Sequence, residues 1–462
     1  MAARDRIVPL VVACPLFLQN LDTSVMATAL PSIAHSLQVP VLQLNLAITS
    51  YLLSLAVFLP LSGWCAERFG ARRVFCGAIA FFSLGSALCG AANSLPSLVL
   101  FRVVQGLGGA MMVPVGRLIL LRSVPSARMV AAMVWFTVPP TIGRMAGPLF
   151  GGAIVTWTSW RWIFLVNIPF GLLGIALALT FIGAHHNEDT DRAPFDGMGF
   201  MLLALGLTAL LGALEATGKA LVPSWVTATA ATLGALALAL YVLRSRRRAS
   251  PIVDLAILRY RTYRTAIFGG LPLRIAIGAS PFLLPLMLQV GFGLSPLASG
   301  TLTVATAIGS LATRAVMVQT IRRVSFRSLL IGATLLASLF RASYGLFQPA
   351  TPHLLIFCVL LLGGLVNSMG MVALQTLGFS QIPKPRMSHA TTLSSMAQQI
   401  SVSLGVVIGA ELVSATAWWH GGSSAHLLAR DFSPAFVALG AISLLSLFFF
   451  VRLARDEGAE LR

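Results

Sequence analysis

The chain has 462 residues, of which 57% are hydrophobic and only 10% are charged, and its mean hydropathy is +0.87. These values exclude a soluble globular protein, because apolar runs of membrane-spanning length recur from end to end. The formal net charge of +18 is scattered over separate short segments, so we interpret it as membrane topology and contact with anionic lipid rather than nucleic acid binding.

The apolar runs predict an all-α integral membrane protein with about fourteen transmembrane helices. Strands are not expected, because the runs are too long and do not alternate. In chain order, the expected spans are 7–30, 42–64, 74–93, 98–121, 130–154, 161–183, 197–215, 223–243, 265–289, 298–320, 328–346, 353–377, 391–415 and 434–452. The first run contains Gln19, Asn20 and Asp22 and is too long for a signal peptide.

Loop lengths divide these spans into a 6+2+6 arrangement. We expect an N-terminal six-helix bundle at 1–184, two extra central helices with flanking cytoplasmic loops at 185–264, and a C-terminal six-helix bundle with a cytoplasmic tail at 265–462. Most of the 32 Lys and Arg residues fall in segments that are cytoplasmic if the N-terminus is cytoplasmic. The sequence therefore predicts a multi-pass protein of a cell (inner) membrane, with both termini inside.

A weak internal repeat relates the two six-helix parts at an offset of 255 residues. The matched pairs are Arg68 and Arg323, Arg72 and Arg327, and Gly77 and Gly332. Repeats of six spanning helices are typical of transporters, whose substrate site lies near the membrane midplane between the repeats.

Asp22 and Arg102 are ionisable residues inside apolar spans. At ~1.5 Å per residue, Asp22 lies roughly 22 Å along the first span and Arg102 about 6 Å along the fourth, which runs the other way. Both therefore fall at nearly the same depth, in the outer third of the membrane. Such groups are costly unless they are paired, hydrated or functional, so a proton-coupling role and a purely structural ion pair are both open.

Several motifs accompany this pair. Residues 63–73 read Gly-Trp-Cys-Ala-Glu-Arg-Phe-Gly-Ala-Arg-Arg, in which we single out Gly63, Glu67, Arg68, Gly70, Arg72 and Arg73. Residues 21–31 read Leu-Asp-Thr-Ser-Val-Met-Ala-Thr-Ala-Leu-Pro, and residues 102–106 read Arg-Val-Val-Gln-Gly. Residues 147–152 read Gly-Pro-Leu-Phe-Gly-Gly, and residues 160–169 read Trp-Arg-Trp-Ile-Phe-Leu-Val-Asn-Ile-Pro.

Taken together, these motifs resemble those of the major facilitator superfamily, and within it the fourteen-span drug:proton antiporters of the EmrB/QacA type. The resemblance covers the whole chain. It implies a proton-driven secondary transporter that exports small, amphipathic molecules, in which residues 63–73 act as a conformational switch loop. Its partners would be a small-molecule substrate, protons and the lipid bilayer, and Asp22 with Arg102 would couple the proton.

The antiporter motif in the fifth span also has a physical interpretation. Gly143, Gly147 and Gly151 are four residues apart, so they share one helix face and allow another helix to approach closely. Pro148 adds a bend, and Gly152 completes the motif. The resemblance implies a hinge that restricts proton leak, whereas simple helix packing is the alternative.

Polar residues in the spans are candidates for a substrate cavity. They are Asn20, Gln105, Arg274, Asn367, Gln375, Gln398 and Gln399. For the glutamines, hydrogen bonds between helices are an equally good explanation. Because Arg102, Arg144, Arg274 and Arg341 also lie well inside spans, we expect a neutral, weakly acidic or anionic substrate.

Some positions depart from the motif pattern. Glu67 stands where Asp is usual, Ala27 replaces the usual Asn, Arg144 replaces Pro, and the second-half loop at 322–327 lacks the glycine and the acid. These departures leave open a membrane sensor or scaffold that kept the fold and does not transport. A proton-coupled transporter of one physiological solute is a separate alternative.

No cofactor chemistry is indicated by the sequence. The spacing of Gly212, Gly218 and Lys219 misses the phosphate-loop pattern, and the glycines at 106–109 lack a strand–helix context, so no nucleotide is expected. The seven histidines and five cysteines show no ligand spacing, so we expect no metal site and no disulfide. The chain is not expected to be an enzyme.

Overall fold

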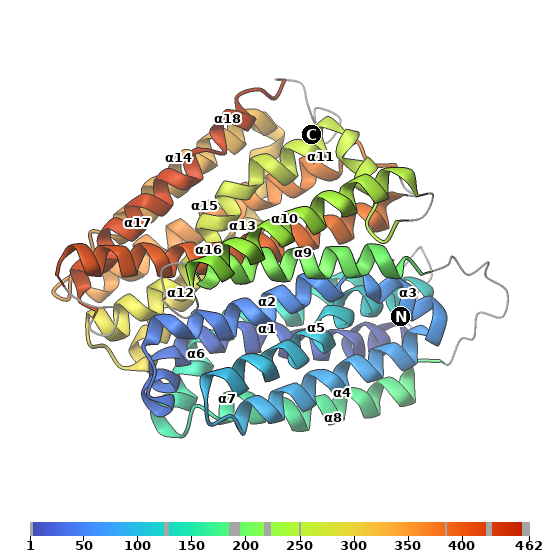
Figure 1. Cartoon of the computed structure of the whole chain (residues 1–462), viewed down its shortest axis with the longest axis horizontal. Helices are drawn as coiled ribbons and strands as arrows, with labels where there is room; N and C mark the ends of the chain where they lie inside the picture. Colours follow the sequence, from blue (N-terminus) through green and yellow to red (C-terminus); the bar gives the residue numbers. More distant parts are fainter. Residues whose placement is uncertain are drawn as a thin grey trace. The chain divides into compact units, whose positions relative to one another are not determined.

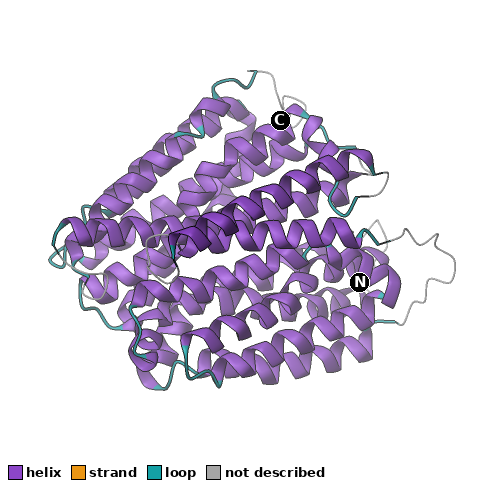
Figure 2. Cartoon of the chain, viewed as in Figure 1, coloured by secondary structure: helices purple, strands orange, loops and turns teal. Residues whose placement is uncertain are grey.

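A computed structural model gives the fold of the chain. It describes residues 3–123, 129–183, 195–216, 223–248, 251–383, 386–421 and 427–454. Over these ranges the regular structure is helical and no strand occurs (Figure 2). The predicted all-α class is therefore confirmed.

The helices follow one another with short connections. In the first part of the chain they are α1 (Ala3–Leu37), α2 (Asn45–Phe58), α3 (Leu61–Phe69), α4 (Ala71–Gly90), α5 (Leu95–Ser123), α6 (Met129–Trp157), α7 (Trp162–Leu165), α8 (Asn167–Phe181), α9 (Gly197–Ala216) and α10 (Ser224–Arg247). They continue with α11 (Arg261–Arg264), α12 (Gly270–Leu286), α13 (Pro296–Arg323), α14 (Phe326–Tyr344), α15 (His353–Phe379), α16 (Met387–Trp419), α17 (Ala429–Leu444) and α18 (Leu447–Phe450). Short 3-10 helices lie at Val41–Leu44 and Leu255–Arg259, and single π-helical turns flank α12 at Thr265–Gly269 and Met287–Gly291.

Twelve helical segments of the described residues are long and apolar enough to cross a membrane. Helices α6 and α13 are 29 and 28 residues long but are not among these twelve. The chain is therefore a multi-pass membrane protein, and the count of fourteen spans stays a prediction.

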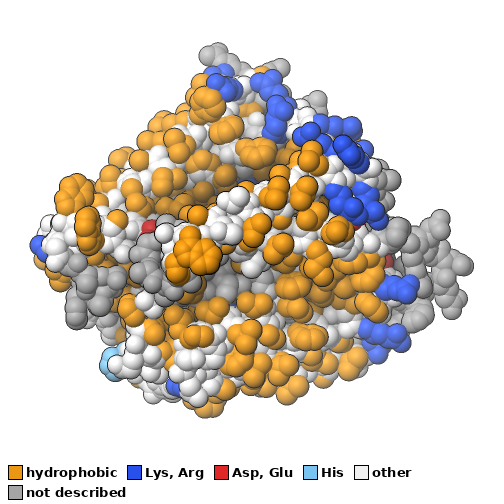
Figure 3. Space-filling view, in the orientation of Figure 1, with side chains coloured by type: hydrophobic (Ala, Val, Ile, Leu, Met, Phe, Trp, Pro, Cys, Tyr) orange, Lys and Arg blue, Asp and Glu red, His pale blue; other side chains and the backbone are white. Residues whose placement is uncertain are grey.

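Large apolar side chains cover the surface of the helices, as expected where they face lipid (Figure 3). In each of the two units defined below, the Lys and Arg side chains visible in this view gather mainly at one end of the helices.

The chain divides into two compact units. The N-terminal unit comprises Met1–Val39 and Leu46–Ile252, and the C-terminal unit comprises Pro40–Asn45 and Val253–Arg462. Helices α9 and α10 pack against each other within the N-terminal unit. The separate central segment expected at 185–264 stays a prediction.

Packing within the two units follows the same plan (Figure 1). In the N-terminal unit α1 lies along α6, and α4 packs against both α5 and α8. In the C-terminal unit α12 lies along α16, and α14 packs against both α15 and α17. The first residues of α4 and α14, Ala71 and Phe326, are 255 residues apart, which is the offset of the sequence repeat.

Local signals explain where several helices begin. Ser295 caps α13 by accepting a hydrogen bond from the Ala298 amide, and Pro296 takes the first helical position. Ser325 caps α14 in the same way. Gly70 separates α3 from α4 with a φ of 87°, a conformation that residues with a side chain rarely adopt.

Candidate functional site

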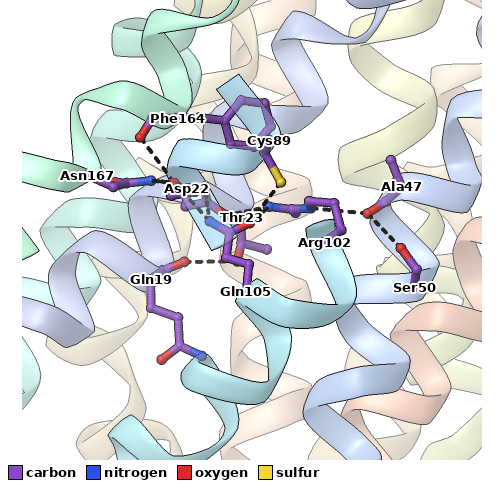
Figure 4. A network of polar contacts seen from close by, with 11 residues as sticks. Gln19, Asp22, Thr23, Ala47, Ser50, Cys89, Arg102, Gln105, Phe164 and Asn167 are labelled. Carbon is purple, nitrogen blue, oxygen red and sulfur yellow. Dashed lines mark hydrogen bonds and ion pairs between the residues drawn. The ribbon is translucent and has the colours of Figure 1, made fainter. Parts of the chain in front are cut away.

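Four helices of the N-terminal unit contribute to a buried polar network (Figure 4). Asp22 comes from α1, Ser86 from α4, Arg102 and Gln105 from α5, and Asn167 from α8. All five side chains are buried, and Asp22 and Arg102 are only 3% and 1% exposed. The sequence placed Asp22 and Arg102 at similar depth, and the structure brings them into contact.

Both carboxylate oxygens of Asp22 accept hydrogen bonds. Oδ2 accepts from Nη1 of Arg102 at 2.7 Å. Oδ1 accepts from Nε2 of Gln105 at 3.0 Å and from Nδ2 of Asn167 at 3.1 Å. Three donors therefore hold the ionised form, which is how a buried carboxylate is tolerated away from water.

Ser86 links the side-chain amides of Gln105 and Asn167 on the side away from Asp22. Its hydroxyl oxygen accepts from Nδ2 of Asn167 at 2.8 Å and from Nε2 of Gln105 at 3.2 Å, and it donates to the Phe164 carbonyl at 3.0 Å. The hydroxyl thus fixes both amides at once, which orients their second N–H groups toward Asp22.

The guanidinium of Arg102 is held on several sides. Nη1 also donates to Oε1 of Gln105 at 2.6 Å, and Nε donates to the Ala47 carbonyl at 3.1 Å. Its central carbon lies 4.3 Å from the centre of the Tyr51 ring and 5.7 Å from that of Phe164. Arg102 is therefore immobilised, and its charge is matched by Asp22.

Glycines of α5 and α4 allow the close approach that assembles the network. A Cβ at Gly85 would lie 2.5 Å from the Gln105 backbone nitrogen, and one at Gly106 would lie 2.6 Å from the Ser54 Cβ. A Cβ at Gly108 would clash with the Phe82 backbone. The glycines of the fourth-span motif thus serve to dock α5 on its neighbours, and this docking positions Arg102 and Gln105.

Sequence reasoning gave no role to Ser86 or Asn167. Asn167 stood in a quoted motif, and a buried amide in an apolar span was the signal that could have singled it out. Ser86 carried no such signal, because serines are common in spanning helices. Gln105 was expected to line a cavity, but the structure places it within the network.

The glycine face of α6 meets α1. A Cβ at Gly143 would lie 2.5 Å from the Phe17 carbonyl oxygen, and one at Gly147 would clash with the Ser24 side chain. A Cβ at Gly151 would lie 3.0 Å from the Val25 side chain. The close helix approach expected from the antiporter motif is therefore present, with Pro148 and Gly152 on the same helix.

Arg144 stands beside this glycine face and contacts α1 twice. Its Nη2 donates to Oδ1 of Asn20 at 2.7 Å, and its carbonyl oxygen accepts from the Ser24 hydroxyl at 3.0 Å. Arg144 is exposed and Asn20 is half-buried, so both side chains are accessible from outside the unit.

The charged residues expected in a switch loop lie instead at the end of α3 and in the first turn of α4, because only Gly70 separates the two helices. Glu67, Arg68 and Arg73 are exposed. Arg72 reaches the C-terminal end of α8, where its Nη1 donates to the Ile182 carbonyl at 3.1 Å. A cation at a helix C-terminus is favourable because the last carbonyls carry partial negative charge. A Cβ at Gly63 would meet only open space.

The remaining cavity candidates belong to the C-terminal unit. Arg274 is buried on α12, and Asn367 of α15 accepts a 2.9 Å hydrogen bond from Nη2 of Arg341. Gln375 is exposed, and Gln398 and Gln399 are half-buried on α16. These residues form no network comparable to that around Asp22 in the described part of the unit.

Comparison with known proteins defines the class to which this architecture belongs. Residues 12–406 match the family described as Major Facilitator Superfamily. The chain belongs to this family, and it is a membrane transporter by fold and sequence.

Two sets of relatives extend this result. The chain is 37% identical to "Putative multidrug resistance protein MdtD" of Salmonella heidelberg (strain SL476) and of Salmonella newport (strain SL254), over 96% of this chain and 94% of each relative. Among solved structures it is similar to a D-xylose-proton symporter, with a TM-score of 0.69 and 15% identity over 98% of both chains. It is also similar to a POT family transporter in complex with 5-aminolevulinic acid, with a TM-score of 0.71 and 14% identity over 99% of this chain and 96% of that one. The solved structures support the fold alone.

Proposed function

We propose that the chain exports small organic molecules in exchange for protons, and that Asp22 is the group that binds the proton. The observation that carries this proposal is the placement of one carboxylate in a buried network within a spanning helix, where both oxygens are held by donors. The name of the 37% identical relatives supports multidrug export as the kind of transport.

Protonation of Asp22 would change the network in a defined way. A neutral carboxylic acid no longer balances Arg102, so the guanidinium would be left as a buried charge without a counter-ion. That state is favourable only if water or another group reaches Arg102. Loading a proton would therefore favour a conformation in which the pair is separated, which links proton binding to a change of state.

Gln105 and Asn167 suit both protonation states. An amide can donate through its nitrogen to a carboxylate, or accept through its oxygen from a protonated acid. Oδ1 of Asn167 is buried and has no hydrogen-bond partner in the structure, so rotation of this amide would offer an acceptor to protonated Asp22. The amides of Gln105 and Asn167 would thus keep the Asp22 carboxyl group hydrogen-bonded both before and after it binds a proton.

The energy available from protons is adequate for export. One proton moving down a 100 mV potential supplies ~2.3 kcal/mol, before any pH gradient is counted. Export results if proton and substrate stabilise conformations that open to opposite sides. A cell (inner) membrane location with cytoplasmic termini is part of the proposal, and it rests on the distribution of Lys and Arg.

The test is proton movement in vesicles that contain the purified protein. An imposed proton gradient should drive uptake of a dye into inside-out vesicles, and addition of the dye should release protons from the lumen. Asp22→Asn should show neither effect while inserting normally. Movement of dye and protons in the same direction would replace export with import. Dye transport that is indifferent to the proton gradient would overturn the proposal.

A further inference from the structure

Arg144 is a cation near the middle of two packed helices of the N-terminal unit. It lies 15 residues after the first residue of α6 and 13 before the last. Its Nη2 donates to Oδ1 of Asn20 at 2.7 Å, so the guanidinium is held at the level of Asn20 on α1. Asn20 is 13 residues from one end of the spanning segment Ile7–Leu37 and 17 from the other, or about 20 and 26 Å. The charge therefore lies well inside the spanning helices, away from both ends.

The backbone around Arg144 is fixed by the contact between α6 and α1. Gly143 and Gly147 let α6 approach Phe17 and Ser24 of α1 closely. The Arg144 carbonyl oxygen also accepts a 3.0 Å hydrogen bond from the Ser24 hydroxyl. Because Arg144 stands between the two glycines, the start of its side chain is held against α1. The place of its guanidinium is thus a fixed feature of this helix pair.

The Arg144 side chain is nevertheless exposed. Arginine stays protonated under all ordinary conditions. A permanent cation that is accessible at this depth is costly against lipid tails, and it is tolerated where water reaches it. On the neighbouring helix, Thr23 of α1 is exposed as well, one turn after Asn20. The exposure of Arg144 is therefore explained if this face of α1 and α6 is open to water inside the membrane.

The charge of Arg144 is not matched by an acid of the described residues. Asp22 is held by Arg102, and Arg144 forms no ion pair with any residue that the structure describes. The other acids described in this unit lie at or near helix ends, namely Asp5 in α1, Glu67 in α3, Asp196 before α9 and Glu215 in α9. A guanidinium has five N–H donors, and only one of those of Arg144 is used by a described side chain. The others are left for a ligand.

This position is separate from the network around Asp22. Asn20 and Asp22 are two residues apart on α1, so their side chains leave the helix about 200° apart. Asp22 is held by Arg102 of α5 and Asn167 of α8, whereas Asn20 accepts from Arg144 of α6. One helix therefore carries the buried acid on one side and an accessible cation–amide pair on another.

We propose that Arg144 binds the anionic group of a transported molecule, a carboxylate attached to an apolar body, and that Asn20 positions the guanidinium. A carboxylate matches the free N–H donors in charge and geometry, and the same charge repels a cationic substrate. Half-buried Phe17 and Pro148 lie one helical turn from Asn20 and Arg144, so apolar surface adjoins the charge. This inference rests on the proposed transport function, because the bound anion is taken to be the substrate.

The first test is direct binding, which requires no transport. Purified protein in lipid nanodiscs is titrated with benzoate, naphthalene-2-carboxylate and anthracene-2-carboxylate, with the three matching carboxamides, and with (naphthylmethyl)trimethylammonium. We expect at least one carboxylate to bind better than its amide. Its Kd should rise roughly 10- to 100-fold in Arg144→Gln and by less in Arg144→Lys, which keeps the charge, whereas amide binding should hardly change.

Asn20→Asp provides a second route to the same result. The new carboxylate stands where Arg144 already donates, so it occupies the guanidinium and neutralises its charge. Binding of the carboxylate probe should fall as it does in Arg144→Gln, although Arg144 is still present. Asn20→Ala keeps the cation and removes only its positioning, so the loss should be smaller than in Asn20→Asp.

Matched controls guard against loss of folding. Arg161 of the same unit stacks on Trp160 and donates to the Ala92 carbonyl, so Arg161→Gln should leave carboxylate binding unchanged. The carboxylate should raise the thermal unfolding temperature of the original protein and not that of Arg144→Gln or Asn20→Asp. Without ligand, Asn20→Asp should unfold no earlier than the original protein, because it adds an ion pair.

Water access is tested by labelling with a charged, membrane-impermeant methanethiosulfonate. The five cysteines are first replaced by alanine or serine. Thr23→Cys should then react, and bound carboxylate should slow the reaction unless Arg144→Gln is also present. Ile142→Cys is the control, because Ile142 is 47% exposed but points away from Arg144 on α6, about 200° around the helix. It should not react, since lipid tails cover that side.

Several results would overturn the inference: no carboxylate binds, the trimethylammonium probe binds best, Thr23→Cys does not react, or Arg144→Gln and Asn20→Asp bind carboxylates like the original protein. If chloride or phosphate alone binds at Arg144 and no carboxylate competes, the substrate claim is wrong.

Asp22→Asn separates this inference from the proposed antiport. It should keep Arg144-dependent carboxylate binding, because the two side chains lie on different sides of α1. Arg144-dependent binding in a protein that moves no protons would leave the anion site standing and remove the proton-exchange proposal. Proton-coupled dye transport without any Arg144-dependent carboxylate binding would do the opposite.

Discussion

One nitrogen of Arg102, Nη1, donates to both Asp22, at 2.7 Å, and the side-chain oxygen of Gln105, at 2.6 Å. Gln105 in turn donates to the other oxygen of Asp22 at 3.0 Å. The three side chains therefore form a closed ring of hydrogen bonds with one acid and one base. A change at any member alters the other two, so substitutions within the ring should not be additive.

Asp22→Asn should abolish proton-coupled transport while the protein still inserts and folds. The amide nearly keeps the shape of the carboxylate but cannot titrate. Substrate-driven proton release in vesicles should fall to the level of vesicles without protein. Asp196→Asn is a matched control, because Asp196 is also buried but pairs with Arg244 near the end of α10, outside the network. Equal loss in both variants would point to a folding defect rather than to proton binding.

Arg102→Ala should be more damaging than Arg102→Lys. Removal of the cation leaves a buried carboxylate without its partner, at a cost of about 3–5 kcal/mol, whereas lysine keeps the charge and loses the Nε bond to the Ala47 carbonyl. In both variants the pH dependence of transport should differ from that of the original protein, because the proposed proton-binding carboxylate loses the guanidinium that donates to its Oδ2. Identical pH–rate profiles in the original protein and both variants would show that the two groups are not coupled.

Gly147→Ala should destabilise the contact between α6 and α1. The added Cβ clashes with the Ser24 side chain, and overpacking of this kind costs about 1–3 kcal/mol. Ser24→Gly in the same chain removes the clashing atoms and should recover most of the lost stability, measured as the thermal unfolding temperature in detergent.

Gly212→Ala is the matched control for this helix contact, because a Cβ at Gly212 meets open space. It should be neutral or slightly stabilising, since alanine favours helix over glycine. If Gly147→Ala is as well tolerated as Gly212→Ala, the glycine face does not depend on close approach.

Gly70→Ala should impair the protein through backbone strain. Gly70 has a φ of 87°, and forcing a side chain into such a conformation costs on the order of 1–3 kcal/mol. No neighbouring atom would touch the new Cβ, so strain is the only penalty expected. Gly63→Ala, also in open space but inside α3, should leave the unfolding temperature nearly unchanged. A larger drop for Gly63→Ala than for Gly70→Ala would contradict this explanation.

The structure changes how the sequence motifs are understood. Gly143 and Gly147 were predicted to share a face from their spacing alone, and the structure identifies Phe17 and Ser24 as what that face contacts. Arg72 was singled out as part of the switch loop at 63–73, and the structure shows that its side chain contacts the C-terminal end of α8. Such partners could not be predicted, because the spacing along one helix says nothing about which helix lies beside it.

The candidate cavity residues show the limit of reasoning from composition. Gln105 was grouped with residues of a substrate cavity, yet its side chain is used by the acid network. Asn167 was left without a role and contacts Asp22 directly. A polar side chain in an apolar span signals that it has a partner, but sequence does not distinguish a partner in the protein from a ligand.

The sequence by itself determined that this chain spans a membrane, is helical and belongs to the Major Facilitator Superfamily, because length and composition of the apolar runs leave no other fold and the motifs are specific. It also identified Asp22, Arg102 and Arg341 as ionisable residues inside apolar spans. Only the tertiary structure decided that Arg102 is neutralised by Asp22, whereas Arg341 and Arg274 form no ion pair with the residues that the structure describes. Whether a buried charge is balanced depends on which helices meet, and residues 80 positions apart in sequence, such as Asp22 and Arg102, become neighbours only when α1 and α5 pack in one unit.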